Sequence, residues 1–235
     1  MELTLVTAFF RLPEDRGRDY LALFDELAGV GLPIVVYFDA ALAEGLERVS
    51  RHRNVTVVPS RIEDSWTGRT LAQWPELALP RRRNPGKDSR AFLTLTNAKL
   101  DYLVAARYSV SSSHYAWVDF GVLHVVPQPG RAGFLDALRN VPLPERGLLA
   151  PGCRDRATDL EALWDGIYWR FCGGFLAGDR ASLTSLYARY RQTFAEEVGR
   201  RKALTWEVNI WALLEARGLP FQWYPADHDA SLVPR

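Results

Sequence analysis

Apolar and polar residues alternate in blocks along the chain, and these blocks predict an α/β fold. Short apolar runs with the composition of buried strands cover residues 3–10, 33–38 and 55–58. Between them, residues 18–28 and 40–49 carry apolar positions at helical spacing. A strand, helix, strand, helix, strand order is typical of a parallel sheet with right-handed crossovers.

The second half of the chain predicts longer helices around one short central strand. Residues 89–107 read as one long helix, and residues 180–202 as an amphipathic one. Thr205 is a candidate N-cap for a last helix over 205–216, which Gly218 ends. The other predicted pieces are a strand over 115–118, a short helix over 132–138, a strand over 147–150, a helical turn over 159–164, a glycine-broken aromatic strand over 168–178 and a strand over 221–224, with 62–85 irregular.

No internal repeat or low-complexity linker interrupts this pattern, so we expect a single domain over residues 1–231. The expected fold class is α/β, a mostly parallel mixed sheet flanked by helices. Residues 232–235 match the left half of a thrombin cleavage site and are set aside as a candidate cloning remnant.

Composition narrows the functional classes. In 235 residues, 48% are hydrophobic and 24% charged, as in ordinary globular proteins. A net charge of +1 argues against nucleic-acid binding, which needs a basic face. Two cysteines, Cys153 and Cys172, form neither a disulfide framework nor a Cys-x-x-Cys pair, which favours the reducing cytoplasm. Cys172 lies in an apolar stretch and is expected to be inert packing. No apolar run predicts a transmembrane segment.

The most informative motif is the strand over 115–118, which ends on Asp119, with Gly121 two residues later. Ligands of α/β proteins bind outside the carboxyl ends of the strands. Glycine lets the backbone approach a ligand or adopt positive φ. Two interpretations stay open: Asp119 faces a ligand, or it only caps the following turn.

Several motifs that would indicate other activities are missing. No Gly-x-Gly-x-x-Gly follows the first strand, and no Walker loop is present. The chain also lacks the Gly-x-Ser-x-Gly elbow of α/β-hydrolases and a His-Glu-x-x-His zinc motif. The site is therefore expected to differ from a dinucleotide, P-loop, hydrolase or zincin site.

The order of short motifs along the chain resembles the bacterial HtrL/YibB-like family, which is similar to GT-A-fold glycosyltransferases. The resemblance spans roughly residues 3 to 229, and its most specific block is Trp117–Gly121. It implies a GT-A-like, Rossmann-like fold and a hexosyltransferase-like enzyme that moves a sugar from a nucleotide-sugar donor to an unidentified sugar, natural-product or protein acceptor. The other motifs are Val6–Phe9, Val35–Asp39, Asn97–Lys99, Gly173–Phe175 and Trp206–Glu207.

The resemblance also implies a divalent cation, Mn²⁺ or Mg²⁺. GT-A enzymes hold the ribose and the metal with an Asp-x-Asp motif, and Asp119 matches its first acid. Gly121 stands at the second position, so the metal site is completed elsewhere, or the nucleotide binds with little help from metal. His228, between Asp227 and Asp229, is the second candidate ligand. His124 is expected to pack or to hydrogen-bond after its turn.

Candidate catalytic residues are Glu207 and Asp119. Glu207 would act as general base on the acceptor hydroxyl or position the donor sugar, unless it is only a helix N-terminal charge. Lys99 is preferred to Arg90 for the diphosphate, because nine residues on one regular helix place them on opposite faces. The full set expected to bind nucleotide and donor is Thr7, Ala8, Phe9, Arg11, Asp39, Arg90, Lys99, Asp119, Gly121, Gly173 and Gly174.

Two further functions stay open. The first is a nucleotide- or sugar-binding protein without catalysis, which Gly121 in place of an acid would favour. The second is a phosphoryl or nucleotidyl transferase, which would need another carboxylate close to Asp119.

Overall fold

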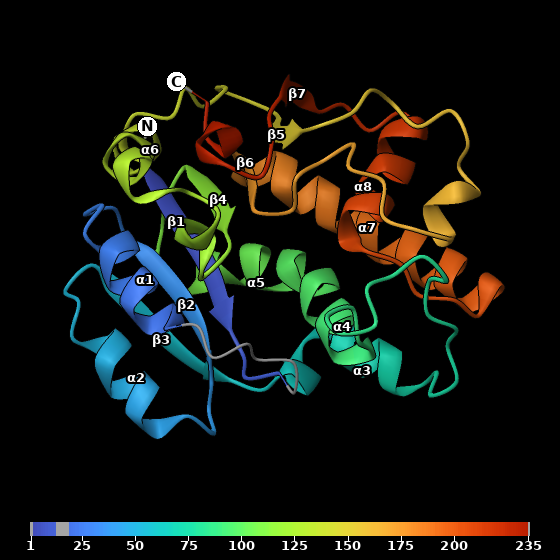
Figure 1. The fold of residues 1–235 in the computed structure, drawn as a ribbon, viewed down its shortest axis with the longest axis horizontal. Coiled ribbons are helices and arrows are strands. Elements are labelled where there is room, and N and C mark those ends of the chain that lie inside the picture. The colour runs from blue at the N-terminus through green and yellow to red at the C-terminus, as the bar shows by residue number, and fades with distance from the viewer. Residues whose placement is uncertain (1, 13–18, 235) are drawn as a thin grey trace.

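The structure, a computed structural model, describes residues 2–12 and 19–234. Within them, all the strands join one sheet in the order β3-β2-β1-β4-β6-β5-β7 (Figure 1). The strands are β1 (Leu3–Phe9), β2 (Ile34–Asp39), β3 (Val55–Ser60), β4 (His114–Val118), β5 (Leu148–Gly152), β6 (Phe175–Asp179) and β7 (Gln222–Pro225).

The sheet is mixed and mostly parallel, as the sequence predicted. Strands β3, β2, β1 and β4 run parallel to one another, and β7 runs parallel to β5. Only β6 is antiparallel, pairing with β4 on one side and β5 on the other. The carboxyl ends of β1, β2, β3 and β4 therefore meet at one edge, where Asp39 and Asp119 end or follow their strands.

Helices cover both faces of the sheet, and residues of β4 alternate between them. Tyr115 and Trp117 pack into a core with α5, α7 and α8, and Ala116 and Val118 pack into a second core with α1 and α6. The helices are α1 (Tyr20–Ala28), α2 (Ala43–Ser50), α3 (Trp66–Ala72), α4 (Arg90–Asn97), α5 (Lys99–Ala105), α6 (Gln128–Arg139), α7 (Arg180–Arg201) and α8 (Glu207–Ala216).

Short 3-10 turns complete the described secondary structure: η1 (Ile62–Asp64), η2 (Ala106–Tyr108), η3 (Val122–His124), η4 (Ala162–Trp164) and η5 (Ala230–Leu232). Over residues 2–12 and 19–234, no helix combines the length and apolar character needed to cross a membrane.

The single long helix predicted over 89–107 is wrong, because the chain forms two helices separated at Ala98. The carbonyl of Asn97 accepts hydrogen bonds from the hydroxyls of Thr67 and Tyr190, at 3.3 and 3.2 Å. These tertiary hydrogen bonds compete with the hydrogen bonds that a continuous helix would form at Asn97. Lys99 consequently starts a helix of its own, and the angular argument that opposed it to Arg90 does not apply.

Other expected boundaries also shift. Residues 62–85 contain the helix α3, which the sequence pattern did not indicate. The aromatic strand is confined to Phe175–Asp179, and residues 168–174 precede it without strand pairing. Trp206, not Thr205, is the N-cap of α8, because the Thr205 hydroxyl donates to the carbonyl of Leu163 at 2.6 Å. Arg18, the first residue of a predicted helix, lies outside the described residues.

The C-terminal residues set aside as a candidate cloning remnant are partly buried. Leu232 and Val233 are both 1% exposed and belong to the core that contains α1 and α6. The hydroxyl of Tyr224 in β7 also donates to the carbonyl of Leu232 at 2.5 Å. These two residues are therefore part of the packed fold.

Candidate functional site

Asp119 directly follows β4, and its carboxylate faces a buried cation. The indole Nε1 of Trp117 donates to Oδ1 at 2.7 Å, and the side chain of Asp119 is 44% exposed. Its backbone N–H donates to the carbonyl of Gly174 at 3.2 Å. The turn is closed by backbone atoms, Val122 N–H to Asp119 O at 2.9 Å, so the carboxylate does not cap it.

Lys99, the first residue of α5, joins Asp119 to Glu207. Its Nζ lies 3.0 Å from Asp119 Oδ1 and 2.8 Å from Glu207 Oε1. It also donates to the carbonyl of Gly173 at 2.8 Å, and the side chain is only 7% exposed. The three hydrogens of the ammonium therefore have three acceptors inside the protein. We call Lys99, Asp119 and Glu207 the lysine–carboxylate cluster.

The cluster contains two carboxylates and one ammonium group. Burial opposes the charged form of Lys99, but the carboxylates of Asp119 and Glu207 outweigh it and raise the pKa of the ammonium. Lys99 thus stays protonated at neutral pH and is no candidate for a base. Glu207, 5% exposed, opens α8, where the helix dipole favours a carboxylate. With both acids ionised, the cluster carries one excess negative charge.

The glycines before β6 make room for the cluster. A Cβ on Gly173 would lie 2.4 Å from Glu207 Oε1 and 3.1 Å from Lys99 Nζ. A Cβ on Gly174 would lie 3.3 Å from a methyl of Leu232 and 3.8 Å from Asp119 Oδ2. Both glycines precede β6 and do not form a bulge within it. Gly173 is therefore required by the ion pairs themselves.

The backbone of Gly121 does not have the conformation that glycine alone allows. Its φ is −101°, so of the two roles open for this glycine, positive φ does not apply. A Cβ there would lie 2.3 Å from Cδ1 of Tyr20 in α1. The side chain that fills the space beside Gly121 is thus an aromatic ring of the same chain.

Thr7, Ala8 and Phe9 are the last three residues of β1 and lie toward the same edge of the sheet as Asp119. Phe9 packs its ring 4.7 Å from that of Phe120, and Ala8 is buried. The hydroxyl of Thr7 is buried and has no hydrogen-bond partner within residues 2–12 and 19–234. A buried polar group without a partner is costly, which makes Thr7 the unsatisfied group of this edge.

Asp39 ties the loops after β1 and β2 together. Its Oδ2 accepts from the backbone N–H of Arg11 at 3.3 Å, and its Oδ1 accepts from that of Ala41 at 3.0 Å. Arg11 itself is exposed. Both residues lie at the carboxyl edge, as expected, although Asp39 also closes the turn after β2.

Arg90 is engaged away from the cluster. Its guanidinium donates to the carbonyls of Leu71 and Trp74, both at 2.8 Å, and of Pro75 at 3.1 Å. These carbonyls belong to the C-terminal end of α3 and the residues after it. Arg90 thus satisfies a helix end, a role that the sequence pattern did not indicate because α3 itself was missed.

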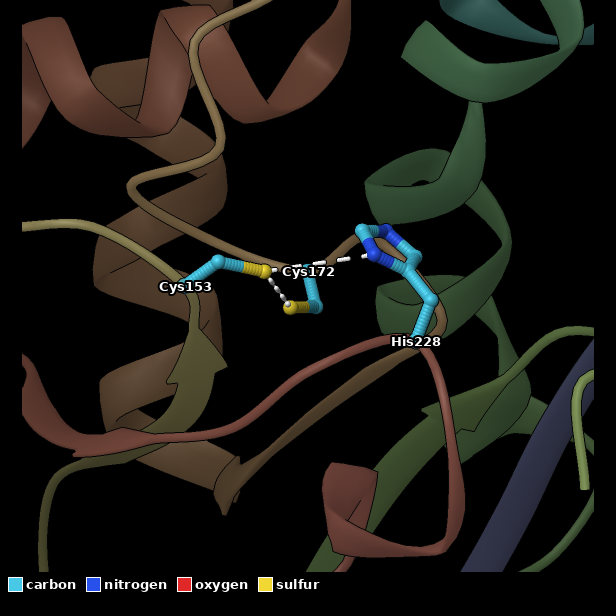
Figure 2. A group of neighbouring side chains, drawn as sticks. All are labelled: Cys153, Cys172 and His228. Carbon is cyan, nitrogen blue, oxygen red and sulfur yellow. Dashed lines mark hydrogen bonds between the residues drawn. The ribbon is translucent and has the colours of Figure 1, made fainter.

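His228 lies beside both cysteines, as Figure 2 shows. Its Nδ1 is 3.9 Å from Cys153 Sγ and 3.5 Å from Asp227 Oδ1, and its ring meets that of Trp169 edge-on at 4.2 Å. The two sulfurs are 3.2 Å apart. The sequence analysis missed this group because Cys153 and Cys172 lie in different segments. His124, as expected, hydrogen-bonds after its turn, with Nδ1 2.7 Å from Gly121 O.

Sequence reasoning also missed Trp117 as a site residue. Residues two apart on an extended strand share a face, and the Trp-x-Asp spacing of Trp117 and Asp119 was the available signal. The structure connects the candidate residues Lys99, Asp119, Glu207, Gly173 and Gly174 through direct contacts, and separately joins Arg11 to Asp39.

Comparison with protein-family models and with curated protein sequences finds no match, so membership of the HtrL/YibB-like family stays a prediction. Among solved structures, the chain is similar to CMP:2-keto-3-deoxy-manno-octonic acid synthetase in complex with CTP. The identity is 13%, the TM-score 0.49, and the match covers 96% of this chain and 90% of that one.

Two other solved structures are similar over most of their length. A 4-diphosphocytidyl-2C-methyl-D-erythritol synthase from Anaerococcus prevotii is 12% identical with a TM-score of 0.45, covering 96% of this chain and 89% of that chain. A glycosyltransferase involved in glycosylation of the PBCV-1 major capsid is 10% identical with a TM-score of 0.47, covering 97% and 82%. At these identities and TM-scores, the matches assign no function to the chain.

Proposed function

We propose that the chain is a GT-A-like glycosyltransferase that moves a sugar from a nucleotide-sugar donor to an acceptor hydroxyl. The observation that carries this proposal is the lysine–carboxylate cluster at the carboxyl end of β4. One of its acids, Glu207, is buried, and the other, Asp119, is 44% exposed. Glycosyl transfer needs a general base and a group that contacts the ribose or a cation. A buried carboxylate beside a half-exposed one can supply these two functions.

Asp119 is the proposed contact for the ribose or for a divalent cation. Its Oδ1 is used by Lys99 and Trp117, and its Oδ2 makes no hydrogen bond to the described part of the chain. Hard cations prefer carboxylate oxygens and accept one or two protein ligands, with phosphates and water completing the shell. When bound, Mn²⁺ or Mg²⁺ would offset the charge of the diphosphate leaving group. The excess negative charge of the cluster favours such an ion.

Lys99 takes a different role from the diphosphate contact expected of it. Because its three ammonium hydrogens bind Asp119, Glu207 and Gly173, a diphosphate could reach it only by displacing one of them. We propose that Lys99 is a positioning residue, which holds both carboxylates in place through its ammonium group.

Glu207 is the proposed general base. Its Oε1 is held by Lys99, and its Oε2 makes no hydrogen bond within the described residues. In an inverting enzyme Oε2 would take the proton of the acceptor hydroxyl as that oxygen attacks the sugar. In a retaining enzyme the same carboxylate would position the donor sugar. Thr7, with its unpartnered hydroxyl, and Asp39 are the proposed nucleoside contacts.

One observation favours nucleotidyl transfer as a second candidate. That reaction needs another carboxylate close to Asp119, and Glu207 shares the Lys99 ammonium with it. The two reactions differ in their products. Glycosyl transfer releases a nucleoside diphosphate from a nucleotide-sugar, and nucleotidyl transfer releases pyrophosphate from a nucleoside triphosphate and a sugar phosphate. A protein that only binds would release neither.

The first test is thermal unfolding with UDP, GDP, dTDP, ADP or CMP, each with and without Mn²⁺. A ligand at about 100 times its Kd stabilises the folded state by about 2.7 kcal/mol, which raises the melting temperature. We expect one nucleotide to stabilise the protein in a metal-dependent way, and Asp119→Asn to abolish that shift. Asp136→Asn, an exposed carboxylate on α6, is the matched control and should keep it. Lack of a shift with every nucleotide would contradict the proposal.

A further inference from the structure

Three metal-binding side chains gather where the ends of three strands meet. Cys153 follows β5, Cys172 precedes β6, and His228 follows β7, and Figure 2 shows their side chains pointing toward one another. One ligand atom from each lies within 4.8 Å of the other two. Both cysteines are free thiols, one exposed and one buried. None of the three belongs to the lysine–carboxylate cluster.

The spacing of these atoms is close to that of a tetrahedral zinc site. With bonds of about 2.3 Å to sulfur and about 2.0 Å to nitrogen, tetrahedral angles place two sulfurs about 3.8 Å apart and a sulfur and a nitrogen about 3.6 Å apart. Here the sulfurs are 3.2 Å apart, and Cys153 Sγ is 3.9 Å from His228 Nδ1. Shifts of a few tenths of an ångström in each side chain would bring these two distances to zinc values, and the third lies within 4.8 Å.

A fourth oxygen donor lies beside two of the three residues, Cys153 and His228. Asp227 Oδ1 lies 3.9 Å from Cys153 Sγ and 3.5 Å from His228 Nδ1. Two thiolates and an imidazole form a ligand set that zinc takes in proteins, with the last position filled by a carboxylate or water. Soft thiolates select zinc over the hard cations Mg²⁺ and Mn²⁺, so this group and Asp119 would bind different ions.

We propose that Cys153, Cys172 and His228 bind one Zn²⁺ ion, with Asp227 or water as the fourth ligand. The proposal is independent of the proposed transferase activity. In the sequence analysis, Asp119 and His228 were the candidate ligands of one divalent cation. In this proposal His228 instead shares a zinc ion with the two cysteines. Cys172 would then be a metal ligand and not inert packing.

The surroundings of the three residues are compatible with a bound cation. Both cysteines are free thiols, and zinc binds cysteine as the thiolate. Zinc would displace both protons and hold the thiolates by direct bonds. Exposure of Cys153 provides an entry path for the ion. The Nε2 of His228 is buried and has no hydrogen-bond partner in residues 2–12 and 19–234. The imidazole is therefore not fixed by a hydrogen bond at Nε2.

Such an ion would stiffen one wall of the candidate active site. Cys172 is followed by Gly173, whose carbonyl accepts from Lys99, and by Gly174, whose carbonyl accepts from the N–H of Asp119. Zinc would link this wall to the residues after β5 and β7. Its function would be structural, because all three ligands lie outside the lysine–carboxylate cluster.

The test is metal binding by the full chain, kept reduced, stripped with a chelator and titrated with Zn²⁺ or Co²⁺. We expect one ion per chain, a rise in melting temperature with Zn²⁺, and with Co²⁺ the sulfur-to-metal charge-transfer band and intense visible bands of a tetrahedral thiolate site. Cys153→Ser and His228→Gln change accessible side chains and should each lose the bands and the rise in melting temperature. Cys172→Ser should do the same, and circular dichroism would establish that each variant is folded.

A matched control separates this site from the proposed cation at Asp119. Asp119→Asn should bind Zn²⁺ as the unaltered protein does, even if no nucleotide binds to either. Two results would overturn the proposal: reduced protein that takes up no Zn²⁺, or Co²⁺ spectra that are unchanged in both Cys153→Ser and His228→Gln. Protein that loses two hydrogen atoms in its intact mass on exposure to air, and binds no zinc after reduction, would point instead to a disulfide.

Discussion

Helix α8 carries a buried glutamate at each end, and the two face different surroundings. Glu207 at its start and Glu215 near its end have side chains that are 5% and 2% exposed. Each pairs with a buried cation: Glu207 Oε1 lies 2.8 Å from Lys99, and Glu215 Oε1 lies 2.7 Å from Arg170. The two pairs are thus alike in burial, charge and distance.

The two carboxylates differ in how many of their oxygens accept a hydrogen bond from the paired cation. Arg170 donates to both oxygens of Glu215, at 2.8 and 2.7 Å, and also to the carbonyl of Arg154, and its guanidinium lies 4.3 Å from the ring of Trp223. Lys99 instead contacts one oxygen of Glu207, and it also pairs with the half-exposed Asp119. We call Arg170 with Glu215 the closed pair, because both carboxylate oxygens are hydrogen-bonded, and it stabilises the fold. We call the lysine–carboxylate cluster open, because it leaves carboxylate oxygens free to accept from a substrate.

The largest effect is expected for Glu207→Gln. Gln keeps the size and an oxygen acceptor for Lys99 but cannot take a proton, so turnover should fall by about 10²–10⁴-fold. The measurement is nucleoside diphosphate release from the donor identified by thermal shift. Glu215→Gln is the matched control: it should lower stability, yet the folded fraction should keep its turnover. Equal turnover in Glu207→Gln and the unaltered protein would remove Glu207 from the chemistry.

Arg170→Leu should cost the most stability. It leaves Glu215 buried without its bidentate partner, and breaking a buried pair on one side costs about 3–5 kcal/mol. Urea unfolding measures the change in the free energy of unfolding. The double replacement Arg170→Leu with Glu215→Leu removes both charges and should recover much of the loss. If the single variant were as stable as the parent, the closed pair would contribute no more than packing does.

Asp179 provides a third kind of carboxylate, satisfied by neutral donors alone. Burial opposes its ionisation, but hydrogen bonds from Ser182, Gly147 and Ala181 outweigh this and lower the pKa of Asp179 to about 2. Because the folded pKa is below the unfolded value of 3.8, its contribution is complete above pH 3.8 and is lost as pH falls through about 2. Asp179 also caps α7, so Asp179→Ala should cost about 1 kcal/mol at pH 7.

The pH dependence checks this assignment. Between pH 4 and pH 2 the Asp179→Ala variant should lose stability less steeply than the parent, because one group with a depressed pKa is gone. Urea unfolding at each pH gives the two slopes. Parallel slopes would show that Asp179 titrates alike in the folded and unfolded states.

The smallest effect is expected for Arg156→Ala. The Nε of Arg156 lies 3.3 Å from Glu215 Oε1, but its side chain is 74% exposed. Solvent-exposed ion pairs contribute less than about 1 kcal/mol, so the free energy of unfolding should hardly change. A loss as large as that of Arg170→Leu would mean that Glu215 depends on both arginines, and the pair would not be closed by Arg170 alone.

Much of the sheet and the acids of the site could be read from local patterns. An apolar run of a few residues predicts the strand before Asp119, and it also predicts that Asp119 lies at the end of that strand. Lys99 and Glu207 were also expected at the site, and they were assigned to separate roles. The ring of Tyr20, which lies far away in the chain and fills the space beside Gly121, could not be predicted from the position of that glycine in a motif.

Features with a short period can be predicted from the amino-acid order alone: buried strands, amphipathic helices, and acids placed at their ends. Which of these side chains share a partner depends on the packed fold. Lys99 and the Gly173 carbonyl are 74 residues apart, Arg170 and Glu215 are 45 apart, and Cys153 and Cys172 are 19 apart. Periodicity reports on neighbours along the chain, and these contacts depend on how strands and helices pack across it. The open cluster, the closed pair and the group of two thiols with His228 are products of that packing.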